Sequence, residues 1–226
     1  LDIWAQSGLK EPLCLMGVGG YGRGEVFPCS DVDVLVLLPN DCHIEDDPVL
    51  KQQVERFIGL CWDMGLEIGS SVRTLDECLT ESAKDITVQT SLLESRHLAG
   101  SVALSREFQK QFLRKLNPND FFVAKTLEMN QRHTKHENTP YALEPNCKES
   151  PGGLRDLQIL LWVAKAARLG HTWDALLKQG IITPHEARQL KLNQTLLSRI
   201  RFKLHMAAGR REDRLVFDMQ AQVARE

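Results

Sequence analysis

The sequence of 226 residues lacks several features that mark particular classes of protein. Its formal net charge is only −2, because 30 Asp and Glu residues nearly balance 28 Lys and Arg residues. This balance removes the strongest reason to expect a nonspecific binder of nucleic acid or of a membrane surface. Apolar runs such as 159–164 fall far short of the roughly 20 residues that cross a bilayer. We therefore expect neither nucleic acid nor a membrane as a partner.

Paired cysteines and targeting signals are also lacking. The six cysteines are spread along the chain without a C-x-x-C pair or a spacing typical of a metal site. We interpret them as reduced structural thiols, so the expected location is the cytoplasm. No signal peptide opens the chain, which begins at Leu1 rather than at Met. We expect a fragment, so missing targeting signals carry little weight.

What the sequence does contain favours a globular protein of mixed class. Hydrophobic residues make up 42% and charged residues 26%, which is ordinary for a soluble fold. Strand patterns occur early and disappear from about residue 84 onward. We predict an α/β (α+β) domain with a small mixed sheet at residues 1–97, followed by an all-helical domain at residues 98–226.

Periodicity and capping signals give the expected elements. Thr74 with Glu77, and Thr183 with Pro184 and Glu186, are typical of helix starts. Strands are expected at 13–18, 32–38 and 66–73. Helices are expected at 49–64, after Thr74, and at 84–99, 102–116, 119–137, 154–169, 172–179 and 184–208.

The most informative stretch is GVGGYGRGEVFPCSDVDVLVLL, residues 17–38. Its glycines at 17, 19 and 22 fit the dinucleotide-binding pattern G-x-G-x-x-G. That motif requires a crossover helix before the next strand, and Pro28 with a strand beginning at Val32 leaves no room for one. We interpret the stretch instead as a glycine-rich turn followed by two aspartates on a strand.

Asp31 and Asp33 occupy positions i and i+2 of this strand, so their side chains leave one face about 6.6 Å apart along the backbone. Neighbouring carboxylates repel each other and resist burial, and a divalent cation resolves both problems. Mg²⁺ binds carboxylates together with substrate phosphates, and two such ions can support an in-line phosphoryl displacement. Bare N–H groups at Gly19 and Gly20 would let a triphosphate approach. The plain alternative is a solvated strand end beside an ordinary turn.

The pattern GG…GR.E…SD.D resembles the nucleotidyltransferase superfamily, whose signature is a small-residue turn followed by a D-x-D strand. The run GGYGRGEVFPCSDVDV is most similar to the PII uridylyltransferase/uridylyl-removing enzymes. Many superfamily members carry a serine that reaches the phosphates where this chain has Gly20, whereas the narrower family has Gly-Gly. The resemblance implies that Asp31 and Asp33 bind catalytic metal, and that Gly19, Gly20 and Ser30 bind the nucleotide.

Two further candidates in this part of the chain stay open. The superfamily often uses a third carboxylate on a neighbouring strand, and we expect Glu67 in that role, with Asp85 as the runner-up. Glu67 could equally be a solvated residue at a strand end. Arg23 is a candidate phosphate contact, or else a surface arginine that pairs with Glu25.

A second motif, NCKESPGGLRD, occupies residues 146–156. Its Pro-Gly-Gly turn would place N–H groups at the start of a helix, where Lys148 and Arg155 would help to bind an anion. Considered alone, it could be a structural turn with a surface ion pair. The run KESPGGLRDLQ again resembles the same family, in the helical domain that follows its transferase domain. TVQTSLLESRHLAG and GRREDRLVFD fit it too, so the resemblance extends over about residues 13–220.

The resemblance implies a transferase that moves UMP from UTP to a tyrosine of the PII nitrogen-signalling protein, with two Mg²⁺ ions. Two alternatives remain: another nucleotide or acceptor, as in protein adenylylation, or a nucleotide-sensing or docking module without turnover. The family's HD-type hydrolase domain is not expected, because the sequence has no His-Asp doublet. Its ACT domains are not expected either, because we expect the fragment to end before these modules would begin. Uridylyl removal and glutamine sensing are therefore not expected of this chain.

Overall fold

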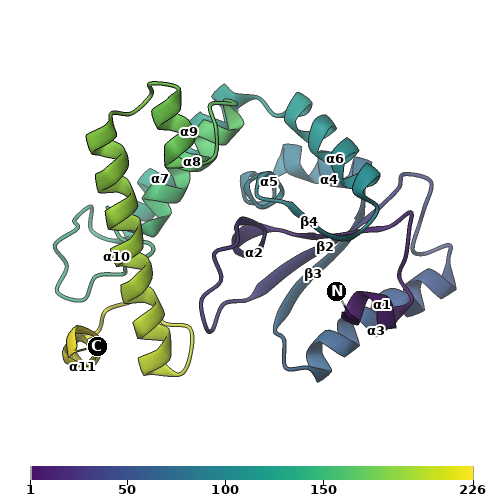
Figure 1. The fold of residues 1–226 in the computed structure, drawn as a ribbon, viewed down its shortest axis with the longest axis horizontal. Helices are drawn as coiled ribbons and strands as arrows, with labels where there is room; N and C mark the ends of the chain where they lie inside the picture. The colour runs from purple at the N-terminus through teal and green to yellow at the C-terminus, as the bar shows by residue number, and fades with distance from the viewer. Residues whose placement is uncertain (1, 226) are drawn as a thin grey trace. The chain divides into compact units, whose positions relative to one another are not determined.

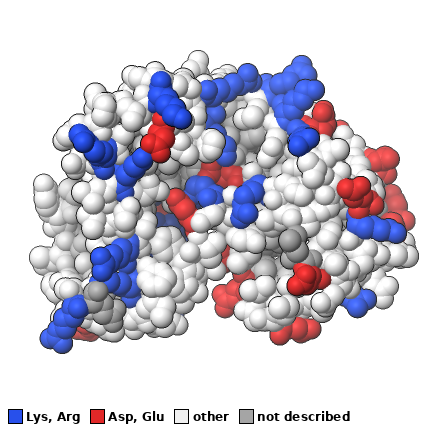
Figure 2. Space-filling model, in the orientation of Figure 1, with Lys and Arg blue, Asp and Glu red and all other residues white. Residues whose placement is uncertain are grey.

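The computed structural model describes residues 2–225, which form two compact units. Unit 1 comprises residues 2–26 and 31–116, and unit 2 comprises Phe27–Ser30 and residues 117–225. Both signs of charge occur on the face shown in Figure 2, as the small net charge predicts. Within residues 2–225, no helix is both long enough and apolar enough to cross a membrane.

Unit 1 is built on a four-stranded mixed sheet with the strand order β3-β2-β1-β4 (Figure 1). β1 runs antiparallel to β2 and β4, and β2 runs parallel to β3. The predicted small mixed sheet is confirmed. The strands are β1 (Cys14–Gly17), β2 (Val32–Leu38), β3 (Ile68–Thr74) and β4 (Arg96–Gly100), and the helices are α1 (Asp2–Ser7), α2 (Gly19–Arg23), α3 (Pro48–Asp63), α4 (Leu75–Lys84), α5 (Ile86–Leu93) and α6 (Val102–Lys115).

Helices cover both faces of this sheet. α1 and α3 lie on one face, and α4, α5 and α6 lie on the other (Figure 1). The valines Val34 and Val36 of β2 pack in the core formed with α1 and α3. Because side chains alternate along a strand, Asp33 points to the opposite side, as the sequence predicts. The sheet therefore separates the Asp33 side chain from the α1–α3 core.

Unit 2 contains helices α7 (Pro118–Lys135), α8 (Leu154–Ala166), α9 (Trp173–Lys178), α10 (Pro184–Ala208) and α11 (Phe217–Arg225). An isolated β-bridge joins Asn146 to Arg214. Two apolar clusters support these helices. One gathers Cys147, Leu204 and Val223, and the other gathers Ala164, Trp173 and Leu176.

Local capping explains several helix starts. The Thr74 hydroxyl accepts a hydrogen bond from the Glu77 N–H, and the Glu77 carboxylate accepts one from the Thr74 N–H. The same reciprocal pair joins Thr183 and Glu186 at the start of α10. Both predicted capping signals are confirmed.

The structure departs from the sequence-based expectations in four places. The glycine turn at residues 19–23 is a short helix, α2. The expected helix at 84–99 stops at Leu93, and β4 follows it because residues 96–100 pair with β1. Since α6 packs on β1 and β4, unit 1 continues to residue 116 rather than ending at 97. α1 and α11 had no predicted counterpart.

Candidate active site

Asp31 and Asp33 lie at the head of β2, and two glycines from other elements leave room for Asp33. A Cβ atom at Gly19 would lie 3.3 Å from Asp33 Oδ2. Gly69 is the register partner of Asp33 on β3, and a Cβ atom there would overlap Asp33 Oδ1. The absence of side chains at both glycines therefore determines where the Asp33 carboxylate can lie.

The helix α2 is packed so closely that a glycine is also required inside it. A Cβ atom at Gly22 would collide with the carbonyl oxygens of Glu94 and Gly17. Arg23, at the end of α2, donates to Glu25 at 2.9 Å and forms an ion pair with Glu94 at 3.3 Å. Pairing of Arg23 with Glu25 is thus confirmed, and a phosphate contact by Arg23 stays a prediction.

A cavity of about 620 Å³ opens beside the two aspartates. Pockets that bind small molecules span a similar range of volumes. Both acidic and apolar side chains line it, and among the apolar ones Trp62 is 66% exposed and Leu66 is 39% exposed. The lining residues are Asp31, Asp33, Trp62, Gly65, Leu66, Glu67, Ile68 and Gly69.

The two candidates for a third carboxylate differ in their surroundings. Glu67 lines the same cavity as the aspartates, and its carbonyl oxygen accepts a hydrogen bond from Val32 N–H at 3.1 Å. Asp85 is the N-cap of α5 and accepts hydrogen bonds from Thr87 N–H and Val88 N–H. The Thr87 N–H bond, the largest effect, holds the pKa of Asp85 below its ordinary value. The cavity lining thus favours Glu67, whose role stays a prediction.

The carboxylates in the lining of the cavity fit a magnesium ion. Asp33 is half-buried and Asp31 is exposed, and both line the open cavity. Carboxylate oxygens are the hard ligands that Mg²⁺ takes, with water or phosphate oxygens completing its octahedral shell. Across residues 2–225, no group of three or more His, Cys, Asp or Glu side chains is arranged to hold a metal ion. Metal binding by Asp31 and Asp33 stays a prediction.

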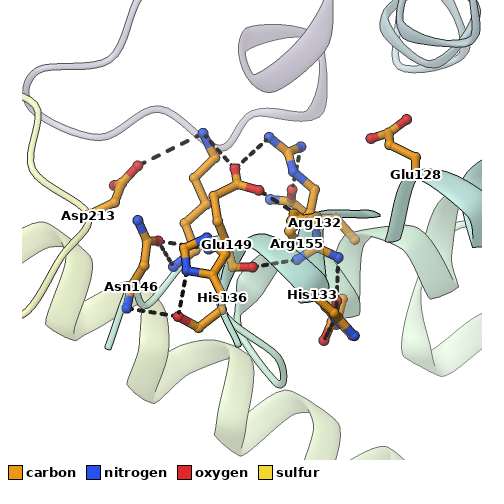
Figure 3. A network of polar contacts seen from close by, with 12 residues as sticks. Glu128, Arg132, His133, His136, Asn146, Glu149, Arg155 and Asp213 are labelled. Carbon is orange, nitrogen blue, oxygen red and sulfur yellow. Dashed lines mark hydrogen bonds and ion pairs between the residues drawn. The ribbon is translucent and has the colours of Figure 1, made fainter. Parts of the chain in front are cut away.

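The second motif lies in unit 2, where its basic side chains form ion pairs with acidic residues of the same unit (Figure 3). Lys148 Nζ lies 3.5 Å from Glu149 Oε1 and 3.9 Å from Asp213 Oδ2. Arg155 reaches the same Glu149 carboxylate at 3.3 Å. Burial and the nearby Arg155 charge lower the pKa of Lys148. A nucleotide-binding role for Lys148 and Arg155 stays a prediction.

The Pro-Gly-Gly turn before α8 also has an internal acidic partner. Gly152 N–H donates to Asp156 Oδ2 at 2.7 Å, and Arg132 and His133 contact the same carboxylate. Burial alone would raise the pKa of Asp156, but the hydrogen bonds from Arg132, Gly152 and His133 outweigh it and lower the pKa. The start of α8 therefore already holds an anion, which the protein itself supplies.

Ser30 differs from the other candidates near the glycines, because it falls in unit 2. Its hydroxyl oxygen accepts a hydrogen bond from Phe27 N–H at 3.1 Å, which closes a turn.

Sequence reasoning missed three residues of the cavity lining, Trp62, Leu66 and Gly69. The one available signal was a glycine within the strand expected at 66–73, because a glycine in the middle of a strand often marks a close approach by another group.

A mixed sheet that carries paired aspartates at the head of an inner strand, beside a glycine-rich segment, is the arrangement that the nucleotidyltransferase resemblance predicts. Comparison with known proteins supports this resemblance. Residues 120–226 match the family model described as GlnD PII-uridylyltransferase, so this part of the chain carries that family's domain.

Curated relatives match almost the whole chain. A bifunctional uridylyltransferase/uridylyl-removing enzyme of Cupriavidus metallidurans is 56% identical over 223 residues, which is 99% of this chain and 26% of the relative. The enzyme of the same name from Burkholderia lata is 56% identical over 222 residues, 98% of this chain and 25% of the relative. The enzyme of that name from Burkholderia mallei is 55% identical over 223 residues, which is 99% of this chain and 26% of the relative. The chain thus spans about a quarter of the length of these relatives.

Proposed function

We propose that this protein transfers UMP from UTP to a tyrosine hydroxyl of a PII signalling protein in the cytoplasm and releases pyrophosphate. The observation that carries the proposal is the presence of Asp31 and Asp33 in the lining of one open cavity. The names of the relatives, which are uridylyltransferases, support the choice of UTP. The family description, which names PII, supports the choice of acceptor.

In this proposal the two aspartates supply the negative charge that binds the metal ions. Asp31 and Asp33 would hold two Mg²⁺ ions, which supply neutralising charge for the attacking and leaving oxygens. Gly19 and Gly20 would offer main-chain N–H groups to the triphosphate. The tyrosine hydroxyl has an ordinary pKa near 10, so its proton must leave as the new bond to phosphorus forms. Phosphoryl transfer of this kind depends mainly on positioning and charge.

The apolar side chains of the cavity lining would take the base. Trp62 and Leu66 are exposed, and aromatic side chains stack on any nucleobase because every base has a π face. Stacking is tolerant of base identity, so these residues would bind a nucleotide without selecting uracil. Protein adenylylation is therefore the second candidate function, since a lining with both acidic and apolar side chains suits either nucleotide.

The decisive variant is Asp33→Asn, which removes one charge with little change in shape. Turnover should fall at least about 10²-fold, because metal-ion charge stabilisation supplies several kcal/mol. The assay incubates the protein with PII, Mg²⁺ and each of the four nucleoside triphosphates, and follows pyrophosphate release and the mass of PII. The matched control is Asp76→Asn, an exposed aspartate on α4 outside the cavity.

The outcomes separate the candidate functions. A gain of UMP on PII supports uridylylation, and a gain of AMP supports adenylylation. Absence of any adduct and of pyrophosphate supports a nucleotide-sensing or docking module. Equal turnover in Asp33→Asn and Asp76→Asn would remove the aspartates from the mechanism.

A further inference from the structure

The segment Phe27–Ser30 leaves unit 1 and packs within unit 2, although the chain on both sides of it belongs to unit 1. Two hydrogen bonds fold it into a turn, from Phe27 N–H to Ser30 Oγ and from Ser30 N–H to the Phe27 carbonyl oxygen. Ser30 is followed directly by Asp31. Any group that fixes this turn therefore acts next to the first aspartate of the candidate site.

Two side chains of α10 hold the turn. The guanidinium carbon of Arg201 lies 4.1 Å from the centre of the Phe27 ring, within cation–π range. The imidazole of His205 lies 5.9 Å from the same ring, and its Nδ1 accepts a hydrogen bond from Cys29 N–H at 3.3 Å. The turn is thus held through its main chain and through an aromatic side chain.

Asp213 binds both α10 residues through side-chain nitrogen atoms. Its carboxylate accepts from Arg201 Nε at 2.5 Å and from His205 Nε2 at 3.3 Å. Because His205 Nδ1 accepts from Cys29, Nε2 must carry the hydrogen, so the neutral imidazole has a partner at both nitrogens. His205 is fully buried and Arg201 is 7% exposed. The three residues are therefore rigidly placed for holding the turn.

We infer that Arg201 and His205 are positioning residues for the transfer reaction: by holding Phe27–Ser30 they fix where Asp31 enters β2. The inference rests on the proposed function. Neither residue is among those that line the cavity, so we do not propose either as a catalytic residue. A displacement of about 1 Å in a catalytic group can lower a rate by 10²-fold, so a fixed approach to Asp31 has kinetic consequences.

The test compares three variants of the protein. His205→Ala removes the acceptor for Cys29 N–H. His205→Asn keeps an oxygen near the position of Nδ1 and serves as the conservative rescue. Leu176→Ala removes buried apolar volume from a separate cluster of unit 2, away from the turn, and controls for a general loss of stability.

Two readouts are measured for each variant. The first is the concentration of Mn²⁺, used as the probe metal, that gives half-maximal pyrophosphate release, together with kcat. The second is hydrogen exchange of the Cys29 amide, which does not depend on turnover. In His205→Ala we expect about a tenfold loss of kcat, a higher half-saturating Mn²⁺ concentration and at least tenfold faster exchange at Cys29. His205→Asn should recover most of each change, and Leu176→Ala should alter none of them beyond its general loss of stability.

Wild-type kcat and Mn²⁺ dependence in His205→Ala, or Cys29 exchange equal to that of Leu176→Ala, would overturn the inference. If the unaltered protein releases no pyrophosphate with any nucleotide, the proposed function fails instead. Unchanged Cys29 exchange in His205→Ala would then still refute the holding contact, and increased exchange would support it.

Discussion

The two units each contain a Gly-Gly step beside charged residues, and they use it differently. In unit 1, Gly19 opens α2 next to Asp33, and the aspartate lines a cavity. In unit 2, Gly152 precedes α8, and its N–H group donates to Asp156 within the same motif. Both segments look like anion sites in the sequence. The difference shows that a glycine-rich helix start can be satisfied by the protein's own carboxylate.

The charged side chains follow the same division. Asp31 and Glu67 of unit 1 are exposed at a cavity that can admit a ligand. Lys148, Arg155 and Asp213 of unit 2 lie in a network of ion pairs and are mostly covered. Carboxylates that line an open cavity can bind a cation, whereas the charged groups of this unit 2 network already pair with one another. We therefore expect a ligand at the cavity of unit 1 rather than at this network.

The largest expected effect comes from breaking the network of unit 2. Asp213→Ala would remove the carboxylate that Arg201 and Lys148 share. The Asp213 side chain is only 12% exposed, so water would replace it poorly. Loss of one partner of a buried pair costs about 3–5 kcal/mol. We expect a loss near the lower end, measured as the free energy of opening from amide exchange in α10.

The matched control for this prediction is Asp174→Ala, in the same unit. Asp174 pairs with Lys191 at 2.6 Å, but the two side chains are 62% and 47% exposed. Exposed pairs contribute about 0–1 kcal/mol, so this variant should lose little stability. Equal losses in the two variants would show that the network around Asp213 is no stronger than a surface pair.

The next effect concerns the cavity of unit 1 and changes activity more than stability. Gly69→Ala would push a Cβ atom into Asp33 Oδ1 and displace that carboxylate. Turnover should fall about 10- to 100-fold, because small displacements of a catalytic group are costly. Pyrophosphate release and a thermal unfolding curve are measured on the same sample.

Gly59→Ala is the control for Gly69→Ala. Gly59 lies within α3, and nothing lies within 4 Å of a Cβ atom added there. This substitution should keep turnover and stabilise the helix by about 0.5–1 kcal/mol. If Gly69→Ala and Gly59→Ala retain the same turnover, the position of Asp33 does not limit the reaction.

Local sequence patterns predicted much of the fold. The valine-rich run gives β2 at Val32–Leu38, and the Thr-x-x-Glu patterns give the starts of α4 and α10, because these signals lie within a few residues. β4 escaped prediction because residues 96–100 form a strand through their pairing with the distant β1. Contacts over long sequence separations are not visible to local patterns.

The candidate site shows the same limit. Asp31 and Asp33 are two residues apart in the sequence, so the prediction that they share one side of a strand needs strand geometry alone. The contact of Gly69 with Asp33 depends on the register of β2 and β3. Likewise, no local pattern reveals that Asp213 lies next to Lys148. Whether a charged residue is accessible or paired is therefore a property of the tertiary structure.

The smallest expected effect is a pH dependence of unit 2 that arises from His205. Burial, followed by the positive charge of Arg201, lowers the pKa of His205 below 6.5, although the hydrogen bond to Asp213 opposes this. Arg211 also contributes a lowering charge, and Cys29 N–H occupies the nitrogen that would be protonated. Well above pH 6.5 the unfolded and folded states both hold the neutral imidazole.

As the pH falls below 6.5, the unfolded chain binds a proton that the folded chain resists, so folding becomes less favourable. The loss is at most about 1.4 kcal/mol per pH unit within the window between the two pKa values. His205→Asn removes this group, and the stability difference between wild type and variant should therefore shrink as the pH is lowered from 7.5 to 5.5. His185→Asn, at an exposed position on the same helix, should retain the decline that comes from His205. If the free energies of unfolding of wild type and His205→Asn stay parallel as the pH falls, protonation of His205 does not weaken the contact that holds Cys29. The ion-pair network of unit 2 would then keep its structure over this pH range.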